Sequence, residues 1–176
     1  MAEARKGEVT MKGNPVDLVG PKLKVGDVAP DFTCVDTNLS PVSLKQTGGK
    51  VRLFNVVPSL DTPVCSIQTR KFSEELNALG DKVDAYTISL DLPFAMKRFC
   101  SDQNIANLVS LSDAHDHSFG EHYGVLISSL PIPLLARAIF VVDAKDKITH
   151  VEIVPEIATE PNYSTALAAL KAASGA

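Results

Sequence analysis

The stretch KVRLFNVVPSLDTPVCSIQTRKF, residues 50–72, joins two different patterns within a few residues. Its first half is an apolar, β-branched run of the kind that forms a strand buried on both faces of a sheet, and Pro58 ends it. Asp61 or Thr62 can then cap a helix, which the spacing of apolar residues extends to Gly80. The stretch therefore predicts a buried strand that passes directly into an amphipathic helix.

The rest of the chain alternates strand and helix patterns in the same way. Further strands are predicted at 31–37, 82–90, 107–113, 136–143 and 147–154, helices at 91–100 and 162–173, and a β-hairpin at 8–20 with its turn at 13–15. Repeated β-α units with an antiparallel β-β-α ending predict an α/β fold with a mixed central sheet flanked by helices, as in thioredoxin-like proteins. No linker or internal repeat divides the sequence, so we expect one domain over residues 1–176.

Composition and charge exclude several classes of protein. The 176 residues carry a formal charge of −4 and their Lys and Arg are scattered, whereas nucleic acids and anionic membranes bind clustered basic residues. The first residues lack the apolar run of a signal peptide, and no later apolar stretch approaches the ~20 residues that span a bilayer. We therefore expect a cytoplasmic protein that binds neither nucleic acid nor membrane.

The three cysteines, Cys34, Cys65 and Cys100, are the first candidates for chemistry. In a reducing compartment they are not a structural disulfide framework, so any pair should form only transiently. Cys34 lies in an alternating strand pattern, where a cysteine usually packs as a small hydrophobic residue. Cys65 lies in the first turn of its helix, where unpaired N–H groups and the positive end of the helix dipole favour a thiolate. Cys65 is therefore predicted to be a nucleophile.

The residues around Cys65 limit what this nucleophile attacks. Position 68 is Gln68, so Cys65 is not half of the Cys-x-x-Cys site of a dithiol reductase. A peroxide, an acyl group or a metal remains. No other Cys or His stands at ligand spacing from Cys65, and the histidines show no signature of a base for acyl transfer. The histidine-rich segment DAHDHSFGEHY, residues 113–123, is interpreted as a solvated polar loop.

The segment PSLDTPVC places Pro58, Thr62 and Cys65 in the pattern Pro-x-x-x-Thr-x-x-Cys. This pattern resembles the signature of the peroxiredoxins. Four further segments, MKGNPV, DLPFAMKRFC, LLARAIFVVD and EPNYSTALAALK, are similar to the bacterial thiol peroxidase subfamily of the peroxiredoxins. The resemblance therefore extends from the N-terminal hairpin to the last helix.

The resemblance implies roles for five residues. Cys65 would be the peroxidatic cysteine and Cys100 the resolving cysteine of a disulfide within one chain, while Pro58, Thr62 and Arg137 would complete the active site. It also implies a thioredoxin-like fold with an N-terminal hairpin, a homodimer, reduction of hydrogen peroxide and organic hydroperoxides, and recycling by thioredoxin. Members of the family use no metal, haem or flavin, so no cofactor is expected.

The chemistry of these residue types fits the implied roles. A hydroxyl at Thr62 and a guanidinium at Arg137 are suited to hold the two oxygens of a peroxide while negative charge builds on the leaving one. Thr62 can also simply cap the helix, a role that can coexist with the first, and a surface ion pair is the alternative for Arg137. The apolar segment ISSLPIPLLA, residues 127–136, is expected to flank the pocket and to favour organic hydroperoxides.

Two further expectations concern the change of structure on oxidation and an alternative function. A disulfide needs Cα atoms within ~7 Å, so Cys65 and Cys100, on separate helices, require the ends of those helices to unwind when the pair forms. The alternative function is a non-catalytic thioredoxin-like redox sensor or interaction module, in which oxidation of the two cysteines changes a partner surface.

Overall fold

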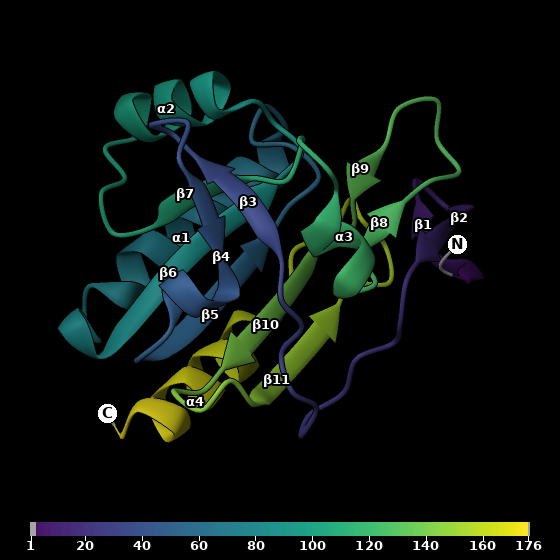
Figure 1. Ribbon diagram of the computed structural model, residues 1–176. Helices are drawn as coiled ribbons and strands as arrows, with labels where there is room; N and C mark the ends of the chain where they lie inside the picture. Colours follow the sequence, from purple (N-terminus) through teal and green to yellow (C-terminus); the bar gives the residue numbers. More distant parts are fainter. Residues whose placement is uncertain (1–2, 176) are drawn as a thin grey trace.

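The computed structural model describes residues 3–175 as two β-sheets with helices packed around the larger one. The larger sheet has the strand order β11-β10-β5-β6-β7-β3-β4, and the smaller has the order β1-β2-β8-β9 (Figure 1). The strands are β1 Ala4–Met11, β2 Asn14–Val19, β3 Thr33–Asp36, β4 Pro41–Ser43, β5 Val51–Val56, β6 Val83–Ser89, β7 Val109–Ser112, β8 Leu126–Ile127, β9 Leu134–Leu135, β10 Ala138–Val142 and β11 Ile148–Ile153. Because β5, β6 and β7 are parallel while β10 and β3 run antiparallel to them, the larger sheet is mixed.

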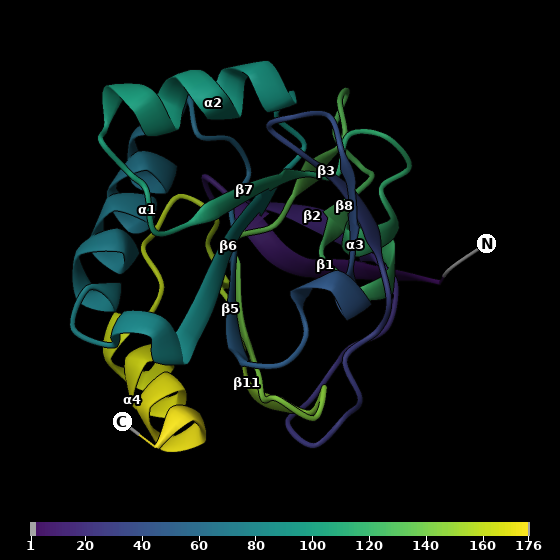
Figure 2. The same cartoon turned by 60° about the vertical axis from the view of Figure 1, so that its left-hand side comes forward.

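The helices cover both faces of the larger sheet. They are α1 Pro63–Leu76, α2 Pro93–Asp102, α3 Ser118–His122 and α4 Tyr163–Ser174, with 3₁₀ helices η1 Leu44–Thr47 and η2 Gly80–Lys82. Figure 2 shows α1 and α4 together on one face, and α3 with the smaller sheet on the other. Within residues 3–175, no helix combines the length and the apolar character that crossing a bilayer requires.

Strand β5 carries core side chains on both of its faces. Val51 and Leu53 pack with residues of α1 and α4, whereas Phe54 and Val56 pack with residues of α3 and the smaller sheet. Successive side chains of a strand point to opposite faces, and burying each of them contributes roughly 1.5–3 kcal/mol relative to exposing it. The predicted strand buried on both faces is confirmed, and its fixed position determines where α1 begins.

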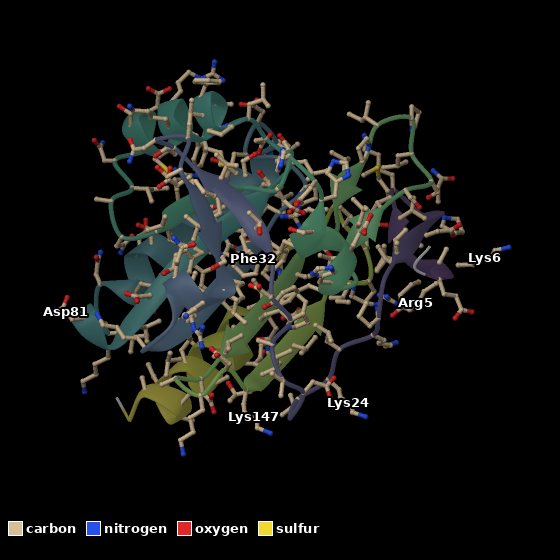
Figure 3. The ribbon with its side chains drawn as sticks, viewed as in Figure 1. Arg5, Lys6, Lys24, Phe32, Asp81 and Lys147 are labelled. Atoms are coloured by element: carbon tan, nitrogen blue, oxygen red, sulfur yellow. The ribbon has the colours of Figure 1, made fainter. Side chains whose placement is uncertain are left out.

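An aromatic cluster fills the space between the larger sheet and α3. Phe32 packs edge to face against Phe54 and Phe119, with ring centroids 5.7 and 5.2 Å apart, and Phe119 stacks on Tyr123 at 4.1 Å. Phe32 is buried, and Figure 3 shows it near the middle of the view, whereas the labelled lysines extend from the outline of the molecule. Aromatic pairs add about 0.5–1.5 kcal/mol beyond the burial of their area, so this cluster holds α3 against β5.

The predicted order of strands and helices is confirmed, with local differences. The antiparallel pair near the C-terminus and the final helix form as expected. Helix α1 ends at Leu76, short of the predicted stop at Gly80: residues 77–79 form turns, and Gly80, with a φ of 55°, begins the 3₁₀ helix η2. The prediction of a polar loop at 113–123 is wrong in part, because Phe119 is fully buried and anchors the short helix α3.

The N-terminal hairpin is confirmed, but its turn is not the predicted one. The hairpin begins at Ala4, earlier than expected, and turns at Lys12 and Gly13. These two residues have φ values of 51° and 80°, and a two-residue turn with positive φ matches the twist of paired strands. Asn14 and Pro15, expected in the turn, instead begin β2 and pair with residues of β1.

Candidate active site

Cys65 is the third residue of α1, and its thiol is free. The helix begins here because Thr62 has an extended backbone (φ −104°, ψ 148°) and the ring of Pro63 presets a helical φ at the first position. The Cys65 side chain is fully buried among apolar side chains that include Val57 and Met96. The first N–H groups of a helix lack partners within it, so the start of α1 has a positive potential.

A pocket of about 320 Å³ lies beside the start of α1. Pro58, Thr62 and Arg137, three of the five predicted site residues, line it together. Cys65 and Cys100 are not among the lining residues, and Cys65 adjoins the wall through its chain neighbour Val64. The other lining residues belong to the hairpin turn, the approach to α1, β9 and the loop before α4: Met11, Lys12, Ser59, Pro63, Val64, Leu134, Ile157 and Ala158.

Arg137 supplies a buried positive charge in the pocket wall. Only 2% of its surface is exposed, its Nε donates to Ile157 O at 2.8 Å, and its Nη1 donates to Gln68 Oε1 at 2.8 Å. A guanidinium has five N–H donors, so these two bonds fix its plane and leave donors for a ligand. No described carboxylate pairs with it at salt-bridge distance. The alternative of a surface ion pair is therefore wrong.

Thr62 has the backbone position of a helix cap without the capping bond. Its Oγ1 donates to Ser59 O at 2.9 Å, and its side chain makes no hydrogen bond to the first turn of α1. Simple capping by the Thr62 side chain is thus excluded. The hydroxyl oxygen keeps lone pairs with which to accept a hydrogen bond from a ligand in the pocket.

Cys100 lies in α2 and is half-buried, with its Sγ 3.3 Å from Ser110 Oγ. It borders a different pocket, of about 330 Å³. The side chains of α2 that pack with Cys65 are those of Met96 and Phe99, and Cys100 follows Met96 by one helical turn. Both thiols are free, so the structure presents the reduced form, in which the predicted disulfide partners belong to two intact helices.

Known sequences that are similar to this chain identify its family. The redoxin family profile matches residues 24–167. The chain is 53% identical over 166 residues to a thiol peroxidase of Listeria innocua serovar 6a, spanning 94% of this chain and 99% of the relative. It is 50% identical over 165 residues to a thiol peroxidase of Bacillus subtilis strain 168, spanning 94% and 97%. The chain belongs to the thiol peroxidases of the redoxin family. It is therefore a peroxidase enzyme.

Solved structures agree with the fold of this thiol peroxidase. A crystal structure of a peroxiredoxin-like protein from Aquifex aeolicus has a TM-score of 0.88 and 44% sequence identity, covering 96% of this chain and 98% of that one. A thiol peroxidase from Chromobacterium violaceum has a TM-score of 0.85 over 93% and 95% of the two chains, and at 20% identity it shows the fold alone. The thioredoxin-like α/β fold predicted from the sequence is confirmed.

Asp91 fixes the loop before α1 of this thiol peroxidase and was not predicted from the sequence. Its Oδ2 accepts from Leu60 N at 2.8 Å and Ser89 Oγ at 2.7 Å, and its Oδ1 accepts from Ser59 Oγ at 2.7 Å. Its carbonyl accepts from Ser112 Oγ at 2.6 Å. These partners follow or end the parallel strands β5, β6 and β7, whose carboxyl ends meet at one sheet edge. An acidic residue directly after a predicted strand was the available signal.

A buried polar chain continues behind Arg137. Gln68 Nε2 donates to Asn55 Oδ1 at 2.5 Å, and Asn55 Nδ2 donates to Thr69 Oγ1 at 3.1 Å and to Thr87 Oγ1 at 3.2 Å. All four of these side chains are buried. A fully paired network in a low-dielectric interior is rigid, so it orients the guanidinium. The signal in the sequence was a glutamine on the otherwise apolar face of the helix.

Cys34 lies on β3, fully buried, as its interpretation as a packing residue predicted. Its Sγ donates to Asp113 Oδ1 at 3.7 Å, and Asp113 also accepts from the backbone N–H groups of Phe119 and Gly120 at 3.0 and 2.8 Å. Burial and then the Asp113 carboxylate raise the pKa of the Cys34 thiol far above its ordinary value. Cys34 therefore packs in the core and donates to the carboxylate that holds the start of α3.

The histidines contribute no metal centre within residues 3–175, where no group of three or more His, Cys, Asp or Glu is placed to hold an ion. His122 instead lies with its Nδ1 2.6 Å from Asp31 O. This contact ties α3 to the segment that precedes β3, which is a structural use of the imidazole.

Proposed function

We propose that this thiol peroxidase reduces hydroperoxides at Cys65 and resolves the product as a Cys65–Cys100 disulfide within one chain. The observation that carries the proposal is the position of Cys65 at the start of α1, against a pocket that holds Pro58, Thr62 and Arg137. Helix N-terminus, hydroxyl and unneutralised guanidinium together favour an anion at this place.

In the first step the Cys65 thiolate attacks one peroxide oxygen. An S–O bond forms while the O–O bond breaks, and the leaving oxygen departs as hydroxide or alkoxide and takes up a proton to give water or an alcohol. Cys65 is oxidised to a sulfenic acid and the peroxide is reduced. The free N–H donors of Arg137 stabilise the charge that builds on the leaving oxygen, while the Thr62 hydroxyl accepts the hydrogen bond of the peroxide O–H.

In the second step the Cys100 thiol attacks the sulfenic sulfur, forming the S–S bond and releasing water. Cys65 is fully buried and packs with Met96 of α2, one helical turn before Cys100, so the first turn of α1 and the end of α2 open to bring the two sulfurs together. Such opening of helix ends belongs to the low-stability end of the native ensemble. A thioredoxin-type dithiol then supplies two electrons and returns both thiols.

The pocket favours organic hydroperoxides over hydrogen peroxide. Its lining is mainly apolar, with Met11, Pro58, Leu134 and Ile157 in its walls. Of the segment 127–136, which was expected to flank the entrance, Leu134 alone is a lining residue. A carbon group bound against these side chains gains affinity from the area that it removes from water.

The proposal extends to the state of the protein in the cell: a single-domain cytoplasmic enzyme that forms a homodimer. Closed two-fold dimers are the commonest oligomers of soluble proteins. Light scattering at micromolar protein should return the mass of two chains of 18.8 kDa, and the mass of one chain would contradict the dimer.

The test couples NADPH loss to thioredoxin reductase, thioredoxin and the purified enzyme, with hydrogen peroxide or cumene hydroperoxide as oxidant. Sustained turnover of the wild type, faster with the organic oxidant, is expected. Mass spectrometry of the oxidised protein should identify a peptide pair joined through Cys65 and Cys100. Slow turnover would favour the redox sensor, and a bond from Cys65 to Cys34 or to a second chain would overturn the role of Cys100.

A further inference from the structure

The loop at 155–158, between β11 and α4, connects the N-terminal hairpin to Arg137. On one side, Ile157 O accepts from Arg137 Nε at 2.8 Å. On the other side, Ile157 N donates to Thr10 O at 2.8 Å, and Thr10 N donates to Pro155 O at 2.7 Å. Ile157 therefore contacts the catalytic cation with its carbonyl group and the hairpin with its amide group.

Glu156, in the same loop, binds the hairpin turn with both carboxylate oxygens. Its Oε1 accepts from the backbone N–H groups of Lys12 at 2.9 Å and Ala158 at 3.0 Å. Its Oε2 accepts from Gly13 N at 3.0 Å and from Thr10 Oγ1 at 2.7 Å. Hydrogen bonds from Ala158, Gly13 and Thr10, in that order, lower the pKa of Glu156 to about 2, so it stays ionised at neutral pH. A turn at the surface thus has a fixed position.

The turn that Glu156 holds is also a wall of the active-site pocket. Met11 and Lys12 line this pocket from the hairpin, Ile157 and Ala158 line it from the loop, and Arg137 lies in the same lining. Figure 1 shows β1 and β2 at the opposite side of the molecule from α2, so this wall is separate from the helix that carries Cys100. Glu156 does not line the pocket and acts through its neighbours.

We infer that Glu156 is a positioning residue that latches the N-terminal hairpin against the pocket and so selects for hydroperoxides with an organic group. The inference rests on the proposed function. An organic group fills the space beside Met11, whereas hydrogen peroxide has no atoms to place there. Arg137 keeps its second anchor, Gln68 Oε1, when the loop shifts, so the groups that hold the oxygens stay in place.

The decisive variant is Glu156→Gln, which preserves shape and removes half of the acceptors. A glutamine has one oxygen and one NH₂ group, and the NH₂ cannot accept a backbone N–H. The Thr10 hydroxyl can rotate to accept from the NH₂, so the unsatisfied donor falls on Gly13 in the turn. We expect kcat/KM for cumene hydroperoxide to fall about 10-fold, chiefly through KM, while the value for hydrogen peroxide changes less than about 3-fold.

Two further variants make the test specific. Glu152→Gln is the matched control: the carboxylate of Glu152 on β11 accepts from Asn162 N at 3.0 and 3.1 Å and lies outside the pocket lining, so both oxidants should be reduced at wild-type rates. Thr10→Val removes one donor to Oε2 and should shift the ratio of the two oxidants in the same direction, by less. It also serves if Glu156→Gln fails to fold.

An equal fall in kcat/KM with both oxidants, or no fall with either, would contradict the inference that Glu156 selects organic hydroperoxides. The outcome is separable from the proposed function. If the wild type shows no Cys65-dependent turnover, the proposed function itself is contradicted. If the wild type is active but Glu156→Gln and Thr10→Val leave the ratio of the rates with the two oxidants unchanged, only the role of Glu156 is contradicted.

Discussion

Cys65 and Cys34 are both fully buried and both free, yet their surroundings are opposite in charge. Cys34 lies on a strand beside the buried carboxylate of Asp113, which accepts its S–H. Cys65 lies at the positive end of α1 and follows Val64, which lines the same pocket as the buried guanidinium of Arg137. Strands have little net dipole, so β3 offers Cys34 no comparable potential.

The difference teaches that burial alone does not decide the reactivity of a cysteine. Removing a thiolate from water is unfavourable at both positions. Near Cys34 the Asp113 carboxylate adds to this cost and the pKa of that thiol rises, whereas Cys65 lies in the first turn of a helix, where N–H groups without helical partners create a positive potential. The predictions below test this contrast, from the largest expected effect to the smallest.

Replacing each buried cysteine by serine tests the contrast most directly. Cys65→Ser should abolish peroxidase turnover, because a serine hydroxyl has no comparable ionised fraction at neutral pH. Cys34→Ser should keep turnover within about 2-fold of the wild type, since that thiol only packs and donates one hydrogen bond. The coupled NADPH assay measures both. More than about a tenth of wild-type turnover in Cys65→Ser would refute the peroxidatic role.

Cys100→Ser separates the first step from the second. Reduction of one equivalent of peroxide should remain fast, while turnover with thioredoxin should stall because no thiol resolves the sulfenic acid. Under excess peroxide, mass spectrometry should find Cys65 as sulfinic acid. If Cys34 can replace Cys100, turnover will persist in Cys100→Ser and disappear only in the variant that lacks both Cys34 and Cys100. That result would contradict the purely structural role of Cys34.

Arg137→Ala removes the cation that distinguishes the surroundings of Cys65. Oxidation of Cys65 should slow about 10- to 1,000-fold, because charge on the leaving oxygen loses its donors. Arg137→Lys is the control. It restores the charge, but a lysine cannot donate to both Gln68 Oε1 and Ile157 O, so its rate of Cys65 oxidation should lie between those of the wild type and Arg137→Ala. Stopped-flow tyrosine fluorescence is suitable because the chain has no Trp. Unchanged rates in both variants would remove Arg137 from the mechanism.

Asp113→Asn tests the other side of the contrast through pH. Burial raises the pKa of Asp113 to about 6, above the ordinary 3.8, even though the N–H groups of Gly120 and Phe119 oppose the shift. A raised carboxyl pKa means that the native state binds the proton more tightly, so the stability contributed is present below pH 4 and is lost as pH rises through 6.

Urea unfolding from pH 4 to pH 7 measures this effect. The wild type should lose stability relative to Asp113→Asn over that interval, by on the order of 2–3 kcal/mol. Other titrating groups are common to both proteins and cancel in the difference. A difference in unfolding free energy that stays constant with pH would show that the Asp113 carboxylate is not destabilised by its burial.

Most of the fold was predictable because its signals are local. The apolar run of β5, the proline after it and the spacing along α1 each specify their own element. The elements that escaped prediction depend on distant partners. Strands β8 and β9 are two residues each: β8 pairs with β2 and β9 pairs with β8. Helix α3 forms where Phe119 inserts into an aromatic cluster.

The site divides in the same way. Pro58, Thr62 and Cys65 are within eight consecutive positions, and their pattern was visible in the sequence. Gln68, Asp91 and Glu156 gave only weak signals, because each acts by receiving or donating hydrogen bonds from residues on other elements. The sequence allowed the Thr62 side chain to cap α1 as well, and only the structure shows that it makes no capping bond and donates to Ser59 O instead.

The sequence by itself determined the order of the longer strands and helices and the place of Cys65 at a helix start, because hydrophobic period and turn residues act over a few positions. Only the tertiary structure decided that Arg137 is a buried cation with no carboxylate at salt-bridge distance among residues 3–175, that Cys34 faces a carboxylate, and that the hairpin is a wall of the pocket. Electrostatic potential and pocket shape depend on distances between residues far apart in the chain, and those distances are fixed only when the sheets and helices pack.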